Sequence, residues 1–485
     1  DTLIGLGGND LLDGGLGVDT VDYSGNTYAG VNVNLVTNTV TSAETGTDTL
    51  VGIENVIGTN FADVITGNNG NNVIDGRGGN DTLAGGGGND TFVFGSDWGV
   101  DTLTDSAGTD TLNFSAVSSD LVVQVNSTGL SVSSGANSLT VSGTVIENII
   151  TGTGNDTFSF GSGASLTGTI DGRSGNNTLD LSATAGSTIN LTGLGTITGF
   201  SGNVAGILNA GFDNITDLIG STVGTDTLIG MNTTSVWNVN NSGNSYQSGG
   251  RTLTFSQVEN LTGGSAADTF NFTGSGSISG SIQGGSGTNV LDYSAYTAGG
   301  ITVSLQAMTA TGVGGTFSNI GALTGSGATD TILVPNAVNT ITITAANAGT
   351  ANGTFSFSAV ENITGGSMAD TFVFADHATM SGTLNGNGGT DTLDYRAYTT
   401  NLNINLSTGI AAAGGVSTTV SNIENIVSGQ ANDVITGDGG DNVLTDVGGT
   451  DIFDGGFGND TYVFLPNWGN GDVVTGAGGI DWMDF

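Results

Sequence analysis

The sequence predicts an all-β protein, folded as an elongated, right-handed parallel β-solenoid. A nine-residue pattern recurs in tandem at 5–22, 58–93 and 428–463. A longer pattern, which contains the first, recurs along the whole chain. Glycine provides 87 of the 485 residues and proline only 2, which excludes collagen-like and proline-rich disordered chains.

The charge balance excludes several classes of partner. The chain has 44 Asp and Glu residues against 4 Lys and Arg, all four of them Arg, and its formal net charge is −40. Four basic side chains are too few to neutralise phosphates. We therefore expect no binding to nucleic acid and no direct binding to an anionic membrane surface. The absence of cysteine excludes disulfides and thiolate chemistry. The sequence has no run of about 18 apolar residues, so it predicts no transmembrane helix.

The nine-residue pattern reads Gly-Gly-x-Gly-x-Asp-x-U-x, where U is a large apolar residue, and 14–22, 85–93 and 455–463 follow it. Six small or polar residues form a tight turn in which glycine permits positive φ, and three residues form a short strand whose apolar residue points inward. Two repeats close one coil, so every second repeat stacks on the same side at about 4.8 Å. The sixth residue, called position six below, then lines up with backbone carbonyls. This oxygen-only donor set suits Ca²⁺ better than Mg²⁺ or Zn²⁺.

The pattern resembles the calcium-binding parallel β-helix repeat of RTX (repeat-in-toxin) proteins. The three tandem blocks carry the resemblance, which is weaker elsewhere. It implies a β-roll with several bound Ca²⁺ ions, and export in unfolded form by type I secretion with folding outside the cell. Within the family, the chain is most similar to a segment of a large bacterial surface adhesin or fibre.

Position six supplies the candidate calcium ligands, and residues two repeats apart, such as Asp63 with Asp81 and Asp433 with Asp451, are expected to share an ion. Asn72 and Asn442 are expected to complete weaker sites. The alternative is an Asp- and Asn-rich turn without metal, which is disfavoured because stacked carboxylates repel. The candidate ligands are Asp10, Asp19, Asp63, Asn72, Asp81, Asp90, Asp101, Asp110, Asp370, Asp391, Asp433, Asn442, Asp451, Asp460, Asp472 and Asp481.

The longer pattern divides the chain into modules. Each boundary is a short motif of Asp or Asn followed by an aromatic residue or Leu, such as Asp22-Tyr23-Ser24. An alternating apolar segment follows each boundary, such as Val31-Val33-Leu35, and predicts a strand with one buried face. The predicted parts are 1–22, the end of a preceding calcium block; 23–113, a module with a four-turn calcium block; 114–180, 181–292 and 293–394, three metal-poor modules; and 395–485, a second module with a four-turn calcium block.

Five of the six glutamates stand in an Ile/Val-Glu-Asn motif, nine residues before a position-six Asp. Two interpretations remain open. The Glu is either a ligand at the end of a calcium row or a cap that accepts backbone hydrogen bonds. The segments Phe212-Asp213-Asn214 and Ser318-Asn319-Ile320 are expected to be degenerate copies. The five motif glutamates are Glu54, Glu147, Glu259, Glu361 and Glu424.

The three middle modules have lost ligands, because Gly168, Gly280 and Gly382 occupy one position-six slot in each. The opposite face keeps one pair per module, and only the last pair has two carboxylates. These pairs are Asp156 with Asn177, Asp268 with Asn289, and Asp370 with Asp391.

Catalytic constellations are missing from the sequence, and we expect no enzyme activity. His377 is the only histidine, no cysteine is present, and no Gly-x-Ser-x-Gly elbow occurs. A polysaccharide lyase is the main enzymatic alternative, but it needs an Arg or Lys base and the chain has only four arginines.

Pairs of aromatic residues follow the calcium turns, as in Asp90-Thr91-Phe92-Val93-Phe94. They are expected to alternate into the core as a ladder of rings, rather than to bind sugars. Trp98 and Trp468 stand in matching insertions and are expected to be exposed.

The first functional hypothesis is a calcium-binding structural repeat protein that forms a rigid extracellular rod, fibre or adhesin stalk on a bacterial surface. The alternative is the C-terminal secretion and folding module of a secreted RTX enzyme or toxin whose catalytic domain lies outside this chain. In both cases the expected location is extracellular. The expected partners are calcium ions, further copies or a continuation of the same solenoid, and a cell-surface or glycan contact.

Overall fold

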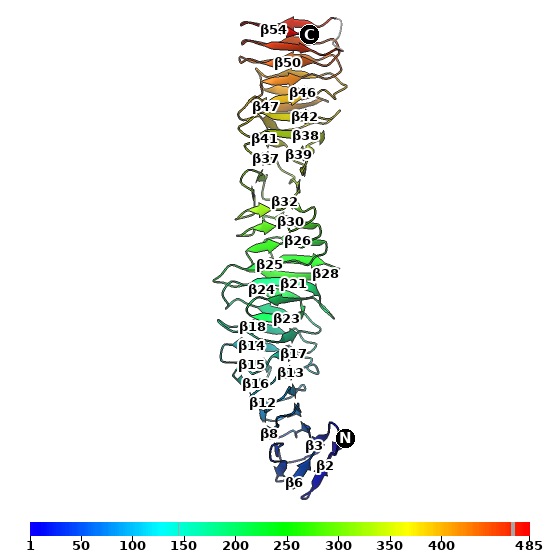
Figure 1. The fold of residues 1–485 in the computed structure, drawn as a ribbon, viewed down its shortest axis with the longest axis vertical. Coiled ribbons are helices and arrows are strands. Elements are labelled where there is room, and N and C mark those ends of the chain that lie inside the picture. Colours follow the sequence, from blue (N-terminus) through cyan, green and yellow to red (C-terminus); the bar gives the residue numbers. More distant parts are fainter. Residues whose placement is uncertain (144, 467–470) are drawn as a thin grey trace. The chain divides into compact units, whose positions relative to one another are not determined.

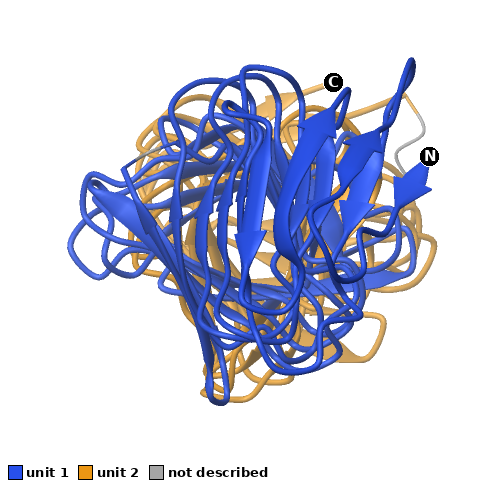
Figure 2. Ribbon diagram, turned by 90° about the horizontal axis from the view of Figure 1, so that it is seen from below, with its two compact units in different colours: residues 1–233, 245–261 blue, residues 234–244, 262–485 orange. Residues whose placement is uncertain are grey.

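A computed structural model describes residues 1–143, 145–466 and 471–485. All regular secondary structure in these ranges is β-strand, from β1 to β54 (Figure 1). The chain divides into two compact units, coloured separately in Figure 2: unit 1 is Asp1–Thr233 with Ser245–Leu261, and unit 2 is Thr234–Asn244 with Thr262–Phe485. A search of the described residues for a helix long and apolar enough to cross a membrane finds none.

Unit 1 contains two stacks of parallel strands, and consecutive strands of the chain alternate between them because two repeats close one coil. In the first stack, β11 pairs in parallel with β9 and β13, so that Phe92 lies opposite Ile74 and Leu112. The first stack contains β1 (Thr2–Leu3), β3 (Thr20–Asp22), β7 (Asn55–Ile57), β9 (Val73–Asp75), β11 (Thr91–Val93), β13 (Thr111–Asn113), β17 (Asn148–Ile150), β19 (Thr169–Asp171) and β25 (Thr227–Ile229). The second contains β2 (Leu11–Asp13), β8 (Val64–Thr66), β10 (Thr82–Ala84), β12 (Val100–Thr104), β18 (Thr157–Phe160), β20 (Thr178–Asp180), β24 (Asp217–Ile219) and β28 (Arg251–Ser256).

The parallel stacks of unit 1 are interrupted by S-shaped segments of three antiparallel strands. In the first segment β4 pairs with β5, and β5 with β6, while β6 pairs in parallel with the preceding β2 and β4 with the following β8. The sheet therefore continues through the segment without a gap. These segments are β4 (Val31–Asn34), β5 (Thr39–Ser42) and β6 (Gly46–Val51); β14 (Val122–Asn126), β15 (Gly129–Ser134) and β16 (Asn137–Ser142); and β21 (Thr188–Leu194), β22 (Phe200–Val204) and β23 (Leu208–Ile215).

Unit 2 repeats this arrangement. Its parallel strands are β30 (Asp268–Gly274), β31 (Ile282–Gln283), β32 (Val290–Tyr296), β35 (Phe317–Ser318), β36 (Ala322–Thr324), β37 (Thr331–Leu333), β41 (Asn362–Thr364), β42 (Asp370–Phe374), β43 (Thr383–Asn385), β44 (Thr392–Asp394), β48 (Asn425–Val427), β49 (Val434–Thr436), β50 (Val443–Asp446), β51 (Ile452–Asp454), β52 (Thr461–Phe464), β53 (Val473–Thr475) and β54 (Trp482–Asp484). Its antiparallel strands are β33 (Thr302–Ser304) and β34 (Thr309–Ala310); β38 (Asn339–Ala345), β39 (Ala348–Ala351) and β40 (Phe355–Ser358); and β45 (Asn403–Asn405), β46 (Ile410–Ala413) and β47 (Val416–Ser421). The strands of 234–262 that remain are β26 (Ser235–Val239), β27 (Asn244–Ser248) and β29 (Asn260–Thr262).

The alternating segments predicted after the module boundaries are strands, but their pairing differs from the prediction. They form β4, β14, β21, β33 and β45, and each pairs antiparallel with the strand that follows it. The parallel solenoid therefore also contains antiparallel segments, which the sequence did not predict. The module boundaries themselves remain a prediction.

The core is built from the apolar eighth residue of each repeat. Ile65, Ile74, Leu83 and Phe92 are all fully buried, each from the middle of its strand. The residues beside them point outward, as expected when side chains alternate along a strand. Val73, for example, is 42% exposed.

Aromatic residues continue the core as a ladder of rings, which confirms the prediction. The second aromatic residue of a pair stacks on the aromatic residue of the next module boundary: Phe94 on Phe114 at 4.5 Å between ring centroids, and Phe374 on Tyr395 at 4.2 Å. The ten paired residues are all buried: Phe92, Phe94, Phe158, Phe160, Phe270, Phe272, Phe372, Phe374, Tyr462 and Phe464.

The predicted exposure of Trp98 is wrong. Its side chain is fully buried and packs edge-on against Phe94 and Phe114, at 6.2 and 5.3 Å between centroids. The insertion that carries Trp98 therefore adds its indole ring to the core. Trp468 lies outside the described residues.

Substitutions within one strand test the inward register. We expect Ile74→Ala to lower the free energy of unfolding by about 2–5 kcal/mol, because it leaves a cavity between stacked coils. Val73→Ala removes an exposed side chain of the same strand and should cost under about 1 kcal/mol. Urea unfolding in excess calcium, followed by circular dichroism, measures both. Equal losses would contradict the register.

Candidate metal sites

Position-six residues form hydrogen-bonded ladders that run from coil to coil. The backbone N–H of Asp63 donates to Oδ1 of Asp81 at 2.8 Å, and the N–H of Asp81 donates to Oδ1 of Asp101 at 2.8 Å. The pairs expected to share an ion are therefore in direct contact. The same bond joins Asp90 to Asp110, Asp370 to Asp391, Asp433 to Asp451, Asp451 to Asp472, and Asp460 to Asp481.

One oxygen of most ladder carboxylates remains without a hydrogen-bond donor. A buried acceptor without a donor lowers the free energy of unfolding, and an anionic acceptor lowers it further. Asp81 and Asp451 illustrate this state, since Oδ1 of each accepts from the backbone and Oδ2 has no partner. The residues whose buried Oδ2 lacks a partner are Asp19, Asp81, Asp90, Asp110, Asp156, Asp391, Asp451, Asp460 and Asp472.

Glycine at the first position of the repeat keeps space beside these oxygens. A Cβ built on Gly76 would collide with Oδ2 of Asp81, and one on Gly455 would collide with Oδ2 of Asp460. The first glycine of the pattern is thus explained by the carboxylate beside it. We call this space, bounded by the position-one residue and the position-six carboxylates, the cradle.

The electrostatics of the ladders are unfavourable without a cation. Burial and then the neighbouring carboxylates Asp101 and Asp63 raise the pKa of Asp81 to about 8. Burial also raises the pKa of Asp101 to about 7, and burial with Asp433 nearby raises that of Asp451 to about 7. Ion pairs in the described residues reach only Asp19, Asp376 and Asp394, so no side-chain cation compensates these groups. Buried, anionic and purely oxygen-based cradles fit Ca²⁺.

Three predicted ligands lie in a different environment, at the first turn of their blocks. Both oxygens of Asp63 accept backbone N–H bonds, Oδ1 from Val31 and Oδ2 from Thr59. Asp370 and Asp433 are held in the same way. The backbone of the turn therefore supplies the positive partner that the later turns lack.

Asn72 and Asn442, predicted as weaker ligands, place Oδ1 in the cradle and direct the amide donor to the preceding coil. Nδ2 of Asn72 donates to the carbonyl of Glu54 at 2.6 Å, and Nδ2 of Asn442 donates to that of Glu424 at 3.0 Å. Their Oδ1 atoms accept from the backbone of the turn. The backbone therefore satisfies both ends of each amide, and we leave both residues out of the proposed calcium set.

The remaining predicted ligands lie at or near the ends of the ladders. Asp10 is half-buried, and its N–H donates to Asp48 at 2.9 Å. Asp472 is half-buried and Asp481 exposed, and each accepts the N–H of the ladder residue before it.

The motif glutamates cap the ladders, which favours the second of the two interpretations left open. Oε2 of Glu54 accepts the N–H of Asp19 at 2.8 Å, across an entire S-shaped segment. Glu147, Glu259, Glu361 and Glu424 accept from Asp110, Asp226, Asp330 and Asp391 at 2.7 to 2.9 Å.

Two of these capped residues, Asp226 and Asp330, were missed from the sequence although both are fully buried position-six residues. The signal was present, because each is followed by Thr and an apolar residue, as in the tandem repeats. The degenerate motif copies lie slightly later than predicted. There the N–H groups of Thr216 and Asp217 donate to the carbonyl of Asn177, and those of Gly321 and Ala322 to Asn289.

Comparison with known families agrees with this geometry. The family model described as "RTX calcium-binding nonapeptide repeat (4 copies)" matches residues 1–25 and 57–92. The model described as "Peptidase M10 serralysin C terminal" matches residues 382–482. No curated protein matches the chain.

The chain therefore contains RTX-type calcium-binding repeats and a serralysin-like C-terminal segment, within an all-β parallel β-roll solenoid. This confirms the predicted resemblance, fold class and ion. Both matches indicate a secreted or extracellular protein.

The stability of the calcium-free chain should depend on pH in an unusual direction. The folded state holds protons on carboxyls such as Asp81, whose pKa is raised to about 8, while the unfolded chain releases them near pH 4. Because the folded state binds more protons, its free energy of unfolding should fall as pH rises from about 5 to about 8. Urea unfolding in calcium-free buffer tests this. In millimolar calcium the loss should disappear, since the ion replaces the protons. A calcium-free chain more stable at pH 8 than at pH 5 would refute the expectation.

Glu259 provides a test of the cap, because both oxygens of its partner Asp226 already accept N–H bonds from Ser187 and Ser221. Glu259→Ala leaves the buried N–H of Asp226 unpaired and should cost about 1–3 kcal/mol of unfolding free energy. Glu259→Gln keeps an acceptor and should cost less. Urea unfolding and bound-calcium stoichiometry distinguish the roles. A Gln variant that loses a calcium ion would instead identify Glu259 as a ligand.

Proposed function

We propose that the chain is a calcium-rigidified structural module, which forms a rigid rod, fibre or adhesin stalk on a bacterial surface. The observation that carries this proposal is the coil-to-coil ladder of buried carboxylates with partnerless oxygens. Once its carboxyls are ionised, such a ladder needs cations to offset its charge, so folding is coupled to calcium. A module of this kind stays unfolded where calcium is scarce and becomes rigid where calcium is abundant.

The stacking of coils supports a mechanical role. Each coil packs on its sequence neighbours through strands and buried rings, so stability is a sum of nearest-neighbour contacts and length is easily extended. The high negative charge opposes compaction until calcium arrives.

We propose no active site for the chain. The single histidine, His377, is 65% exposed and lies beside Asp376, with 3.5 Å between Nε2 and Oδ2. Of the four arginines, Arg77 and Arg251 donate to backbone carbonyls and Arg396 pairs with Asp394. None of these contacts resembles an acid–base pair aimed at a substrate.

The second candidate function is a folding and secretion module attached to an enzyme or toxin. The observation that favours it is the match of 382–482 to the C-terminal part of serralysin peptidases. The two candidates share the calcium chemistry and differ in what the chain is joined to.

Removing calcium should loosen the chain unevenly. Residues 58–113 contain Asp81, Asp90 and Asp110, whose partnerless oxygens need the ion. Residues 199–256 contain Asp226, whose oxygens are satisfied by the backbone. Hydrogen exchange with and without a chelator should therefore show deprotection of 58–113 first.

The same samples examined by electron microscopy should be rigid and extended with calcium and lose that form in chelator. Equal deprotection of both segments would argue against calcium as the stiffening element. A flexible particle in saturating calcium would argue against the rod and leave the folding module as the better candidate.

A further inference from the structure

Two repeats carry Asp in place of glycine at the first position. They begin at Asp105, in 105–113, and at Asp446, in 446–454. This is the position at which a Cβ would collide with the cradle carboxylate in the ordinary repeats. Asp105 and Asp110 also lie outside the residues matched by the nonapeptide model.

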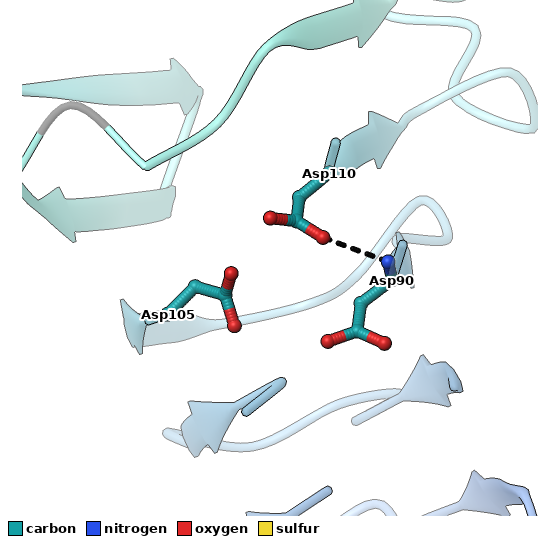
Figure 3. Close-up of side chains that lie close together, drawn as sticks. All are labelled: Asp90, Asp105 and Asp110. Carbon is teal, nitrogen blue, oxygen red and sulfur yellow. Dashed lines mark hydrogen bonds between the residues drawn. The ribbon is translucent and has the colours of Figure 1, made fainter. Parts of the chain in front are cut away.

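The carboxylate of Asp105 joins those of Asp90 and Asp110. One oxygen of each lies within 4.8 Å of the others, and Figure 3 shows the three groups turned toward one another. Asp90 and Asp110 are each 1% exposed. The cradle therefore contains three carboxylates: Asp90 from the previous coil, and Asp105 and Asp110 from positions one and six of the repeat 105–113.

Hydrogen bonds orient these groups and leave one oxygen of each without a donor. Oδ1 of Asp105 accepts the N–H of Gly86 at 2.8 Å, and Oδ1 of Asp110 accepts the N–H of Asp90 at 2.7 Å. The Oδ2 atoms of all three residues are buried and have no partner. Three partnerless anionic oxygens in one cradle are a donor set for a hard cation.

Asp446 occupies the equivalent position in the second block. It is 1% exposed, and neither of its carboxylate oxygens has a hydrogen-bond partner. Its neighbours are Asp451 and Asp472; burial raises the pKa of Asp446, and the carboxylate of Asp472 raises it further. Both of these neighbours also have a buried, partnerless Oδ2.

We propose that Asp105 with Asp90 and Asp110, and Asp446 with Asp451 and Asp472, form two three-carboxylate sites that bind Ca²⁺ more tightly than the other cradles and fill first. The affinity of oxygen-ligand calcium sites rises with the number of charged ligands, and these cradles have one more carboxylate than their neighbours. The inference depends on calcium binding by the repeats and not on the proposed rod.

Substitution to glycine restores the ordinary residue of the repeat and removes only the third carboxylate. Calcium titration of the full chain by calorimetry should resolve two tight sites. Asp105→Gly should leave one of them, and Asp105→Gly combined with Asp446→Gly should leave none, with affinity at each altered cradle reduced at least about tenfold. Asp97→Asn is the control, because Asp97 is an exposed carboxylate in the insertion that carries Trp98 and is not a position-one or position-six residue.

Two further measurements keep the test decisive if a glycine variant folds poorly. Asp105→Asn keeps the size of the side chain and should also lose one tight site, with circular dichroism in saturating calcium reporting the fold. In the unaltered chain, hydrogen exchange during a calcium titration should protect 85–90 and 105–110 at lower calcium than 63–66. The proposal is overturned if the double variant keeps both tight sites, or if protection appears in all three segments together. It is also overturned if the titration resolves no tight class, which would mean that shared protons stabilise the three carboxylates.

Discussion

The structure depends on the carboxylate of the position-six Asp, because each of its two buried oxygens needs its own partner. One oxygen of a ladder Asp accepts the backbone N–H of the position-six residue in the coil before it, as Asp81 does from Asp63. This bond fixes the register of one coil on the next, because a shift by one residue would move the apolar residues out of the core. The second oxygen faces the interior of the turn, where something positive has to meet it.

The chain meets that demand in three ways, which differ in whether the protein itself supplies the partner. At Asp81 and Asp451 the oxygen has no protein partner and requires an ion or a proton. At Asp63 the backbone of the turn donates instead. At Asn72 the carboxylate is replaced by an amide, whose N–H bonds a carbonyl directly. Coils with a partnerless carboxylate oxygen and coils that satisfy it within the protein therefore stack in the same ladders and differ at a few side chains.

Most of the repeat could be predicted from the sequence, because spacing determines which residues stack. The ladder pairs and the buried aromatic rings follow from a constant period. The S-shaped segments could not be predicted in this way, since alternation indicates a strand but not the direction of its partner. The donor role of Asn72 was missed because a side-chain amide is an acceptor or a donor according to its surroundings. Trp98 was misjudged because an insertion was assumed to project outward.

The S-shaped segments also separate one carboxylate ladder from the next, which limits the number of neighbouring negative charges. Five ladders end at a motif Glu, as Asp90 and Asp110 do at Glu147, and two end at Asn177 and Asn289, where no Glu follows. The ladder of Asp63, Asp81 and Asp101 ends at Asp101, before the segment of β14 to β16. Glu appears only opposite a position-six Asp, so cap and ladder residue vary together. Repulsion between carboxylates is thereby confined to short runs. We therefore expect that duplication or loss of one run changes the length of the protein and leaves the charge and the bound ions of the neighbouring runs unchanged.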